Sequence, residues 1–529
     1  MLILLTHRFI TGLMLGLAVL TATLPLATPA VAGWHSLDVL PAHANIADLQ
    51  ISPDSRYVVF RADIEVDERY ELYSVPITGT MPLKLNPPLV AGSDVYQFAV
   101  TPDSQYVIYR AKQEAGESRA DLYRVPITGG QADKLNVGPK AGRHVGNIVI
   151  DPDNVHVVYQ AEHQAEGQNE LFSVPIAGGE TAPLNPPLVA GGIVYNDYAI
   201  DPIGNRVVYR ADQEVDGRVE LYGVPIAGGE AVRLNPPGSR VFDFKINPQA
   251  PVVVFSARPG GSSSTNLYMN TSGGGLLTPL NFPLVANQSV AGFRISPDGA
   301  QVVYYVTADG YTGNLYSVSI GGGASTPLTA PAEPGYGVLA GNLDITADGQ
   351  RVVYYYRKNA MASPVYESVA LTGDNRATLH DQGAGEGLAE RRLSPDGQWL
   401  VYNTAPSFQT YTIPTAGGAP VPLGVGQFLR IMPDSSRVIF NHVQSPFDLQ
   451  SVPIAGGEAR NLSRADDQAD VSDSLISPDG RWIVFEVYYK TGNRELHVSD
   501  GTEAQPPTPT PTPPPSSNVY PVYLPIIVR

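Results

Sequence analysis

The chain has 529 residues, a net charge of −17 and no cysteine. The negative charge argues against nucleic acid as a partner, because phosphate binding needs clustered lysine and arginine. The lack of cysteine excludes disulfides, thiolate chemistry and cysteine-ligated metals, and 52 glycines with 48 prolines indicate many turns.

The N-terminus has the pattern of a secretory signal peptide over residues 1–32. An apolar run at residues 9–20 is followed by Ala30-Val31-Ala32, the small-x-small pattern of a cleavage site. The length of the apolar stretch leaves a membrane anchor as the alternative. Pro25, Pro29 and the cleavage pattern favour secretion, so we expect a secreted, periplasmic or cell-surface bacterial protein. No other stretch is long and apolar enough to span a bilayer.

A hairpin signal recurs along residues 33–504. At Ser296-Pro297-Asp298-Gly299 an apolar strand enters a turn and a second apolar strand leaves it. Proline presets φ early in such a turn, and glycine supplies a positive φ at its end. Copies spaced mostly 45 to 50 residues apart, with one interval of 38, indicate a repeat architecture. The ten copies are centred on Pro53, Pro102, Pro152, Pro202, Pro248, Pro297, Ala347, Pro395, Pro433 and Pro478.

Each repeat has room for four short strands. In residues 193–234 the strands are expected at 195–200, 206–210, 220–226 and 231–234, with an acidic loop at 212–218. This pattern predicts an all-β fold, a β-propeller of four-stranded antiparallel blades with ten repeats. One ring is favoured over two smaller rings. The tenth repeat lacks a clear fourth strand, so residues 34–40 are predicted to complete the last blade beside residues 495–499, because closure removes exposed sheet edges.

Two features that recur along the repeats indicate how the blade interior is packed. The second strands are continuous apolar runs such as Val58-Val59-Phe60, which implies burial on both faces. An aromatic residue recurs in the third strand, as at Tyr73 and Tyr222, and is expected to belong to the core.

These features resemble a known family. The order of features within a repeat is similar to the TolB-type, WD-repeat-like propeller repeat. It runs from a strand to Ser-Pro-Asp-Gly, an apolar strand, a polar loop, Leu-Tyr and a Gly-Gly turn before Leu-Asn. The resemblance covers about residues 46–501. It does not extend to TolB itself, which carries an α/β domain before its propeller, whereas only residues 33–45 lie between the predicted cleavage site and the first repeat.

The C-terminal residues differ from the repeats. Residues 505–517 form a Pro/Thr-rich linker that is expected to be stiff. Residues 518–529 form a short apolar tail, too short and too broken by proline to span a membrane. The tail resembles Tyr-Leu-Pro-apolar-Arg endings of some secreted bacterial proteins. It is either a docking or sorting tag for the envelope or a strand that packs on the propeller.

Motifs for chemistry are absent from the sequence. It contains no Gly-x-Ser-x-Gly elbow, no His-Glu-x-x-His and no phosphate-binding glycine loop, so we expect no catalytic residues and no cofactor. Calcium prefers six to eight oxygen ligands. Asp466, Asp467 and Asp470, close to Asp473, are weak candidates for such a site, and a solvated acidic loop is the preferred interpretation.

The position five residues before each turn proline (or Ala347) is polar in most repeats, and we call these residues the polar column. They belong to the strand that lines a propeller's central channel. The column's members are either a ring that binds a ligand or cation, or side chains that hydrogen-bond to backbone, which is the favoured interpretation. The column consists of Asp48, Gln97, Asn147, Asp197, Asp243, Gly292, Asn342, Glu390, Phe428 and Asp473.

The long loops provide the remaining candidates. The two short turns of each repeat are predicted to lie at one end of the blade, and the long loops at the other, where binding residues concentrate. Four acidic residues of these loops lie above the mouth of the central channel, and they favour a cationic or metal-bridged partner and binding that is weakened by salt. The four are Glu65, Asp67, Glu214 and Asp216, and the mouth is ringed by Asp48, Asp197, Asp243 and Asp473.

Two functions follow from these patterns. The first is a non-enzymatic binding scaffold for a protein, peptide or glycan partner. The alternative is a propeller enzyme at the channel mouth, such as a polysaccharide lyase, since some TolB-like propellers resemble oligogalacturonate lyases that hold a metal with histidines and a glutamine. The channel column contains no histidine, which favours the scaffold.

Overall fold

The computed structural model describes residues 34–501, except residues 40, 42–43, 80, 115–119, 138–144, 164–166, 331–335, 358, 360–363, 382–385, 443–447, 464–468, 490–491 and 493. The described residues form strands and no helix, so the all-β prediction is confirmed. Within this part of the chain, no helix has the length and apolar character that a membrane crossing needs. The predicted signal peptide, linker and C-terminal tail lie outside the described residues.

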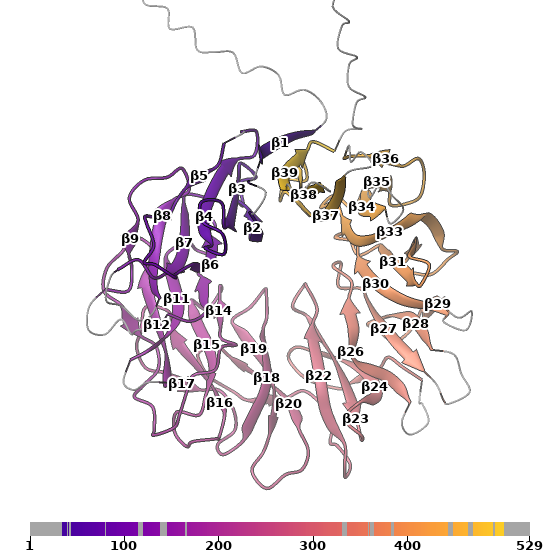
Figure 1. Ribbon diagram of the computed structural model, residues 1–529. Coiled ribbons are helices and arrows are strands. Elements are labelled where there is room, and N and C mark those ends of the chain that lie inside the picture. Colours follow the sequence, from indigo (N-terminus) through magenta and orange to yellow (C-terminus); the bar gives the residue numbers. More distant parts are fainter. Residues whose placement is uncertain are drawn as a thin grey trace, which may run out of the picture. The chain divides into compact units, whose positions relative to one another are not determined.

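Six sheets each contain four antiparallel strands, and the first five of them along the chain form blades 1–5 (Figure 1). Blade 1 contains β2 (Ile46–Ile51), β3 (Tyr57–Ala62), β4 (Glu71–Pro76) and β5 (Leu83–Lys84). Blade 2 contains β6 (Val95–Val100), β7 (Tyr106–Ala111), β8 (Asp121–Pro126) and β9 (Asp133–Lys134). Blade 3 contains β10 (Ile148–Ile150), β11 (His156–Glu162), β12 (Asn169–Pro175) and β13 (Ala182–Pro183). Blade 4 contains β14 (Ala199–Asp201), β15 (Arg206–Ala211), β16 (Glu220–Pro225) and β17 (Val232–Arg233). Blade 5 contains β18 (Arg240–Ile246), β19 (Val252–Arg258), β20 (Asn266–Thr271) and β21 (Thr278–Pro279).

Blades 6–9 form two larger sheets, each of two consecutive blades. In the first, β24 (Thr312–Ser319) pairs with β26 (Gly337–Ile345) and joins blades 6 and 7. In the second, the first half of β33 (Val421–Ile431) pairs with β32 (Gln409–Pro414) and its second half pairs with β34 (Arg437–His442). Blades 6 and 7 contain β22 (Ser289–Ile295), β23 (Gln301–Thr307), β24 (Thr312–Ser319), β25 (Thr326–Pro327), β26 (Gly337–Ile345), β27 (Arg351–Arg357), β28 (Val365–Ala370) and β29 (Ala377–Asp381). Blades 8 and 9 contain β30 (Gly387–Leu393), β31 (Trp399–Ala405), β32 (Gln409–Pro414), β33 (Val421–Ile431), β34 (Arg437–His442), β35 (Leu449–Pro453) and β36 (Arg460–Asn461).

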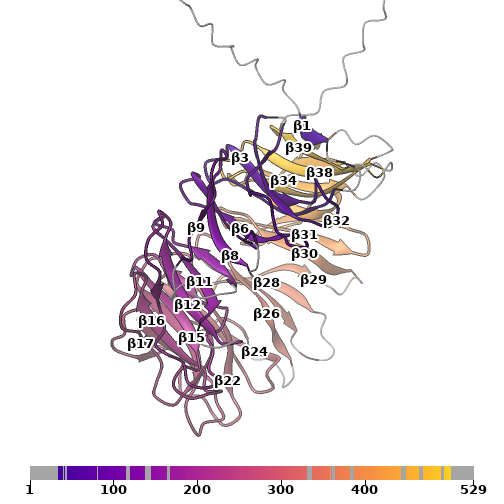
Figure 2. The same ribbon diagram turned by 60° about the vertical axis from the view of Figure 1, so that its left-hand side comes forward.

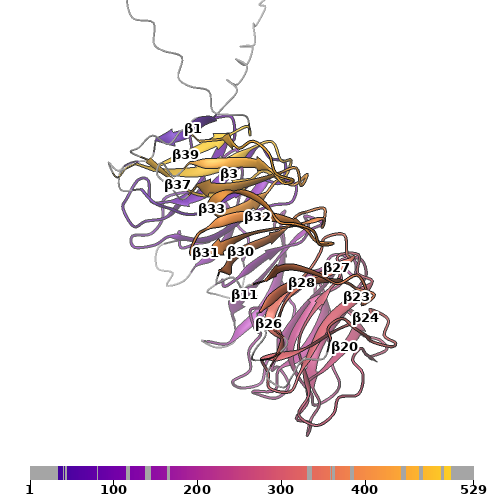
Figure 3. The same ribbon diagram turned by 90° about the vertical axis from the view of Figure 1, so that its right-hand side faces the viewer.

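The last blade combines both ends of the described chain. Blade 10 contains β37 (Ala469–Ile476), β38 (Ile483–Tyr489) and β39 (Arg494–Ser499), and its fourth strand is β1 (Trp34–Val39). Ser36 lies opposite His497 and Val39 lies opposite Glu495, and β1 lies beside β39 in Figure 2 and Figure 3. The prediction that the N-terminal segment completes the last blade is therefore confirmed.

The repeated turn is held by its own side chains. In blade 1, the Ser52 hydroxyl donates to the Asp54 carboxylate at 2.6 Å and accepts the N–H of Tyr57 at 2.9 Å. The residue after the aspartate has a positive φ, which is 70° at Gly299 but also 62° at Ser55. A positive φ is uncommon for serine, so Ser55 needs a compensating contact, which is described below.

The Leu-Asn pair that ends each of the first five repeats also has a structural reason. The Asn86 side chain accepts the N–H of Leu72 at 2.6 Å, and the Asn235 side chain accepts the N–H of Leu221 at 2.7 Å. Both asparagines are buried. The two-residue fourth strand therefore gains an extra bond to the third strand from a side chain, which satisfies a backbone donor that would otherwise be buried without a partner.

The core lies between neighbouring sheets. Val58, Val59 and Phe60 are all buried, so the prediction that the second strands are covered on both faces is confirmed. Tyr73 stacks on Phe60 with ring centroids 5.7 Å apart, and Tyr222 stacks on Tyr209 at 5.6 Å, which places the aromatic column in the core. Among the residues that the structure describes, ten apolar clusters each join two consecutive blades.

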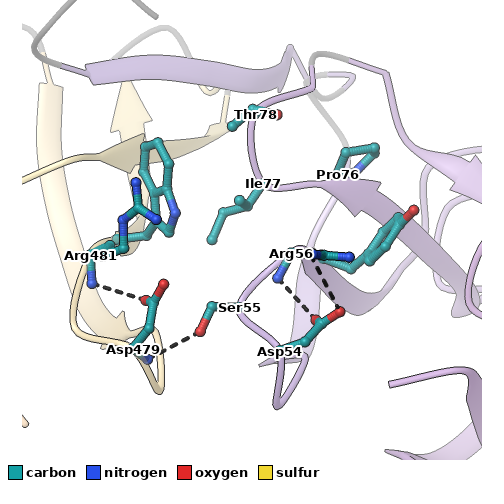
Figure 4. Close-up of a pocket in the computed structure, with 10 residues that line it drawn as sticks. Asp54, Ser55, Arg56, Pro76, Ile77, Thr78, Asp479 and Arg481 are labelled. Atoms are coloured by element: carbon teal, nitrogen blue, oxygen red, sulfur yellow. Dashed lines mark hydrogen bonds and ion pairs between the residues drawn. The ribbon is translucent and has the colours of Figure 1, made fainter. Parts of the chain in front are cut away.

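One of these clusters joins the last blade to the first. It contains Leu37, Phe60 and Leu496, and it closes the series of blade-to-blade contacts. At the short turns, the N–H of Asp479 donates to the hydroxyl of Ser55 at 3.1 Å (Figure 4). This bond is the contact that compensates the positive φ of Ser55. Ser104 and Ser435 have the same φ of 60° and accept the N–H of the preceding blade's aspartate in the same way.

Leu37→Ala tests the contribution of β1 to closure. Leu37 is 1% exposed, so we expect the substitution to lower the free energy of unfolding by about 2–5 kcal/mol, as for a buried leucine. The matched control is Leu276→Ala, because Leu276 is 86% exposed and its loss should change stability by no more than about 0.5 kcal/mol. Equal effects of the two substitutions in urea denaturation would contradict the role of β1.

Candidate binding surface at the long-loop end

The connections between strands divide each blade into two ends. The N–H of Ile77 donates to the carbonyl of Arg56 at 2.8 Å, which places the turn after β4 beside the turn before β3. At the opposite end, the N–H of Val95 donates to the carbonyl of Tyr70 at 2.8 Å, so the start of one blade meets a loop of the preceding blade. The prediction that both short turns share one end is confirmed. We call the two ends the short-turn end and the long-loop end.

In several blades the first strand has a bulge near its start, whereas the short first strands of blades 3 and 4 have none. The pairing shifts between Ile46 and Asp48 in blade 1 and between Val95 and Gln97 in blade 2, and equivalent shifts occur in blades 5, 6 and 8. A bulge bends the edge and redirects a side chain. The polar column predicted from the sequence begins directly after these bulges, at the long-loop end of the strand.

Most described carboxylates of this column pair with a basic residue. The Nε of Arg61 donates to Asp48 at 2.6 Å, and the Nε of Arg210 donates to Asp197 at 2.6 Å. Asp243 lies 3.6 Å from Lys245. The Oε1 of Glu390 lies 3.0 Å from Arg392, and its Oε2 accepts the N–H of Leu429 at 3.2 Å. The expected hydrogen bond to backbone is found for Glu390, whereas Asp48, Asp197 and Asp243 pair with basic side chains instead.

The remaining members of the polar column, and the weak calcium candidates, show no such pairing with a basic residue among the described side chains. The Asn147 side chain accepts a hydrogen bond from the Gln97 amide at 3.2 Å. The side chains of Asn342 and Asp473 lie outside the described residues, as do Asp466 and Asp467. Asp470 is exposed on β37. No group of three or more histidine, aspartate or glutamate side chains that could hold a metal ion occurs in the described part of the chain.

The acidic loops are partly neutralised from within their own blades. Lys84 lies between Glu65, at 2.8 Å, and the buried Glu71, at 2.7 Å. Arg233 lies between Glu214, at 3.0 Å, and the buried Glu220, at 3.7 Å. In each case a basic residue of the fourth strand compensates a loop glutamate. Glu65 and Glu214 are therefore already paired.

Asp67 and Asp216 are different. Both are exposed, and neither forms a hydrogen bond or ion pair with a described residue. Each follows an exposed valine: Val66 is 45% exposed and Val215 is 44% exposed. Two loops at equivalent places in blades 1 and 4 therefore present an apolar side chain next to an unpaired carboxylate.

Sequence reasoning missed a groove at the same end. Its volume is about 670 Å³, and its lining comes from blades 2, 3 and 4, including Tyr96, Gln97, Arg110 and Tyr195. The signal was available in the repeats: Arg61, Arg110 and Arg210 each lie eight residues after a turn proline, and of these three blades only blade 2 lacks an acid in the polar column. Aligning the two columns would have marked Arg110.

No protein-family model matches the chain, and none of the curated proteins compared with it matches. Solved structures do match. A candidate TolB from Agrobacterium tumefaciens is 15% identical with a TM-score of 0.28, covering 44% of this chain and 80% of that one. A eukaryotic initiation factor is 13% identical with a TM-score of 0.45, covering 73% and 90%. A prolyl endopeptidase is 11% identical with a TM-score of 0.38, covering 69% and 55%. At such identities the likeness concerns the fold alone.

Asp197→Ala tests the structural role of the paired column. It removes the carboxylate that holds Arg210, whose side chain is 19% exposed. We expect the free energy of unfolding to fall by about 1 kcal/mol, which lies between the contribution of an exposed ion pair and that of a charged hydrogen bond. The control is Asp216→Ala, which removes an unpaired carboxylate and should have almost no effect. Equal free energies of unfolding for both variants would contradict the role of the pair.

Proposed function

We propose that this protein is a secreted binding scaffold that docks a partner at its long-loop end and catalyses no reaction. The N-terminal signal pattern supports secretion, and the TolB-type repeat supports a place in the bacterial envelope or at the cell surface. The partner is a protein, peptide or glycan. The C-terminal tail provides a candidate contact with the envelope.

The observation that carries this proposal is the pair of exposed loop tips, Val66 with Asp67 and Val215 with Asp216. An exposed carboxylate without a partner is free to meet a cation, and the neighbouring valine offers apolar contact area. The two tips belong to rigid blades, and loops on rigid scaffolds commonly carry binding residues. The tips favour a partner with positive charge, or one bridged by a metal ion, and binding that weakens as salt screens the charges.

The absence of catalytic motifs from the sequence supports a binding function. The column carboxylates Asp48, Asp197, Asp243 and Glu390 already have basic or backbone partners, which leaves them poorly suited to act as acid or base. A propeller enzyme such as a polysaccharide lyase is the alternative. Cleavage of an acidic polysaccharide by the purified protein, with or without a divalent metal, would favour that alternative.

Charge reversal at the loop tips tests the docking end. We expect Asp67→Lys with Asp216→Lys to abolish binding to the basic peptides that the wild type selects from a peptide and glycan array. Opposite charges attract at this exposed site, and reversal turns attraction into repulsion.

The matched control is Glu180→Lys with Glu230→Lys. Both glutamates are exposed beside the Gly-Gly turns at the short-turn end, so the control makes the same change in net charge. Equal loss of binding from both double variants, or loss only from the control, would contradict docking at the long-loop end.

A further inference from the structure

The groove at the inner edge of blades 2–4 has the size of a small-molecule site. Its volume of about 670 Å³ lies within the range typical of ligand pockets. The residues that matter most are Tyr96, Gln97, Arg110, Asn147, Asn169 and Tyr195. They come from the start of β6, the segments just before β10 and β14, the end of β7 and the start of β12, so the groove belongs to the long-loop end.

Arg110 occupies a position that the repeats use for an ion pair. The Nη1 of Arg61 donates to the carbonyl of Val95 at 2.5 Å, and the Nη1 of Arg110 donates to the carbonyl of Val145 at 2.8 Å. Arg210 reaches the carbonyl of Phe242 in the same way, at 2.7 Å. Each of these arginines therefore links its own blade to the beginning of the next blade.

Blade 2 lacks the pair between the arginine and an aspartate of the polar column that blades 1 and 4 have. The Nε of Arg61 and the Nε of Arg210 each donate to an aspartate of the polar column. The corresponding residue in blade 2 is Gln97, whose amide is turned to Asn147. The Nε of Arg110 is buried without a hydrogen-bond partner, and no described carboxylate lies within ion-pair distance of this guanidinium.

The unpaired guanidinium is energetically unfavourable as it stands. Burial, and then the nearby Arg61, lower the pKa of Arg110 from its ordinary value, although arginine remains protonated at any physiological pH. A buried charge normally has an opposite charge or a full set of hydrogen bonds. A ligand carboxylate in the groove would supply the anion that Asp48 and Asp197 supply to the equivalent arginines.

The other groove residues indicate what carries that carboxylate. Tyr96 is 40% exposed, with Arg110 5.9 Å from its ring centroid, and Tyr195 has Arg210 5.6 Å from its centroid. An exposed tyrosine ring can stack against the C–H face of a sugar ring. Gln97, Asn147 and Asn169 add amide groups, each with both donors and an acceptor, which match the paired hydroxyls of a sugar.

We propose that this groove binds a sugar residue that carries a carboxylate, such as a uronic acid unit of an oligosaccharide. The carboxylate pairs with Arg110, the ring lies against Tyr96, and the amides bind the hydroxyls. This inference goes beyond the proposed function, because it rests on the break in the Asp–Arg pairing of blade 2. It does not depend on the loop tips of blades 1 and 4.

Gln97→Asp is the sharpest test. It gives Arg110 the same internal carboxylate that Arg61 and Arg210 have, without removing any cation from the groove. In calorimetry with a uronic acid trisaccharide, we expect the Kd to rise by about tenfold or more, the scale of a charge-assisted pair. The stability should be unchanged or higher. Arg110→Gln should weaken binding similarly by removing the charge. An unchanged Kd in both variants would overturn the proposal.

Three controls make the result specific. The same trisaccharide with its carboxylates methyl-esterified should bind much more weakly, and equal binding would overturn the role of the carboxylate. Asp67→Asn with Asp216→Asn should leave the sugar Kd unchanged, which separates this site from partner docking at the loop tips. A short peptide with a free C-terminal carboxylate should not bind. Binding of that peptide alone, or no binding of the acidic trisaccharide by the wild type, would refute the proposal.

Discussion

Every blade of this protein buries both faces of its sheet against its two neighbours, and the rest of the structure depends on that contact. In the described part of the chain, apolar clusters lie between consecutive blades, including between the last blade and the first. A blade with one uncovered face would expose its apolar second strand to water. The chain therefore has to close, and it does so by giving β1 to the last blade, where Leu37 joins the cluster of Phe60 and Leu496.

Polar contacts define how neighbouring blades meet. The hydroxyl of Ser74 donates to the carbonyl of Ile127 in the next blade, at 2.6 Å, and Ser173 does the same to Ile226 at 2.5 Å. At the short-turn end, Ser55 receives the N–H of Asp479 across the closing interface. These bonds use the turns and the third strands. They leave the long loops and the inner edge of each blade free to vary, and the candidate binding residues lie there.

The repeats predicted most of the fold, since turn chemistry and hydrophobic pattern are local properties. The turns around Pro297, the buried run Val58-Val59-Phe60 and the role of residues 34–39 all followed from spacing and residue type. The candidate site was predicted less completely. Asp48 and Asp197 were recognised as a column, but their pairing with Arg61 and Arg210 was not predicted, because it depends on how the first and second strands of a blade lie against each other.

The same limit applies to the loops. Glu65 and Asp67 look alike in the sequence, yet Lys84 neutralises only Glu65, because the short fourth strand brings Lys84 back beside that loop. Arg110 shows the reverse case, since its importance lies in a partner that is missing. Residues that break a pattern shared by equivalent blades are therefore the best guide to function in this chain, and Gln97 with Arg110 is the clearest break.

Hydrogen–deuterium exchange with and without the uronic acid trisaccharide tests this account most directly, because it reports where the ligand is held without any substitution. The account predicts slower exchange around Tyr96, Gly146 and Val194, which line the groove in blades 2–4. It predicts no change at the short turns around Ser55 or Asp479. Protection confined to the short-turn end, or none near Arg110, would contradict it.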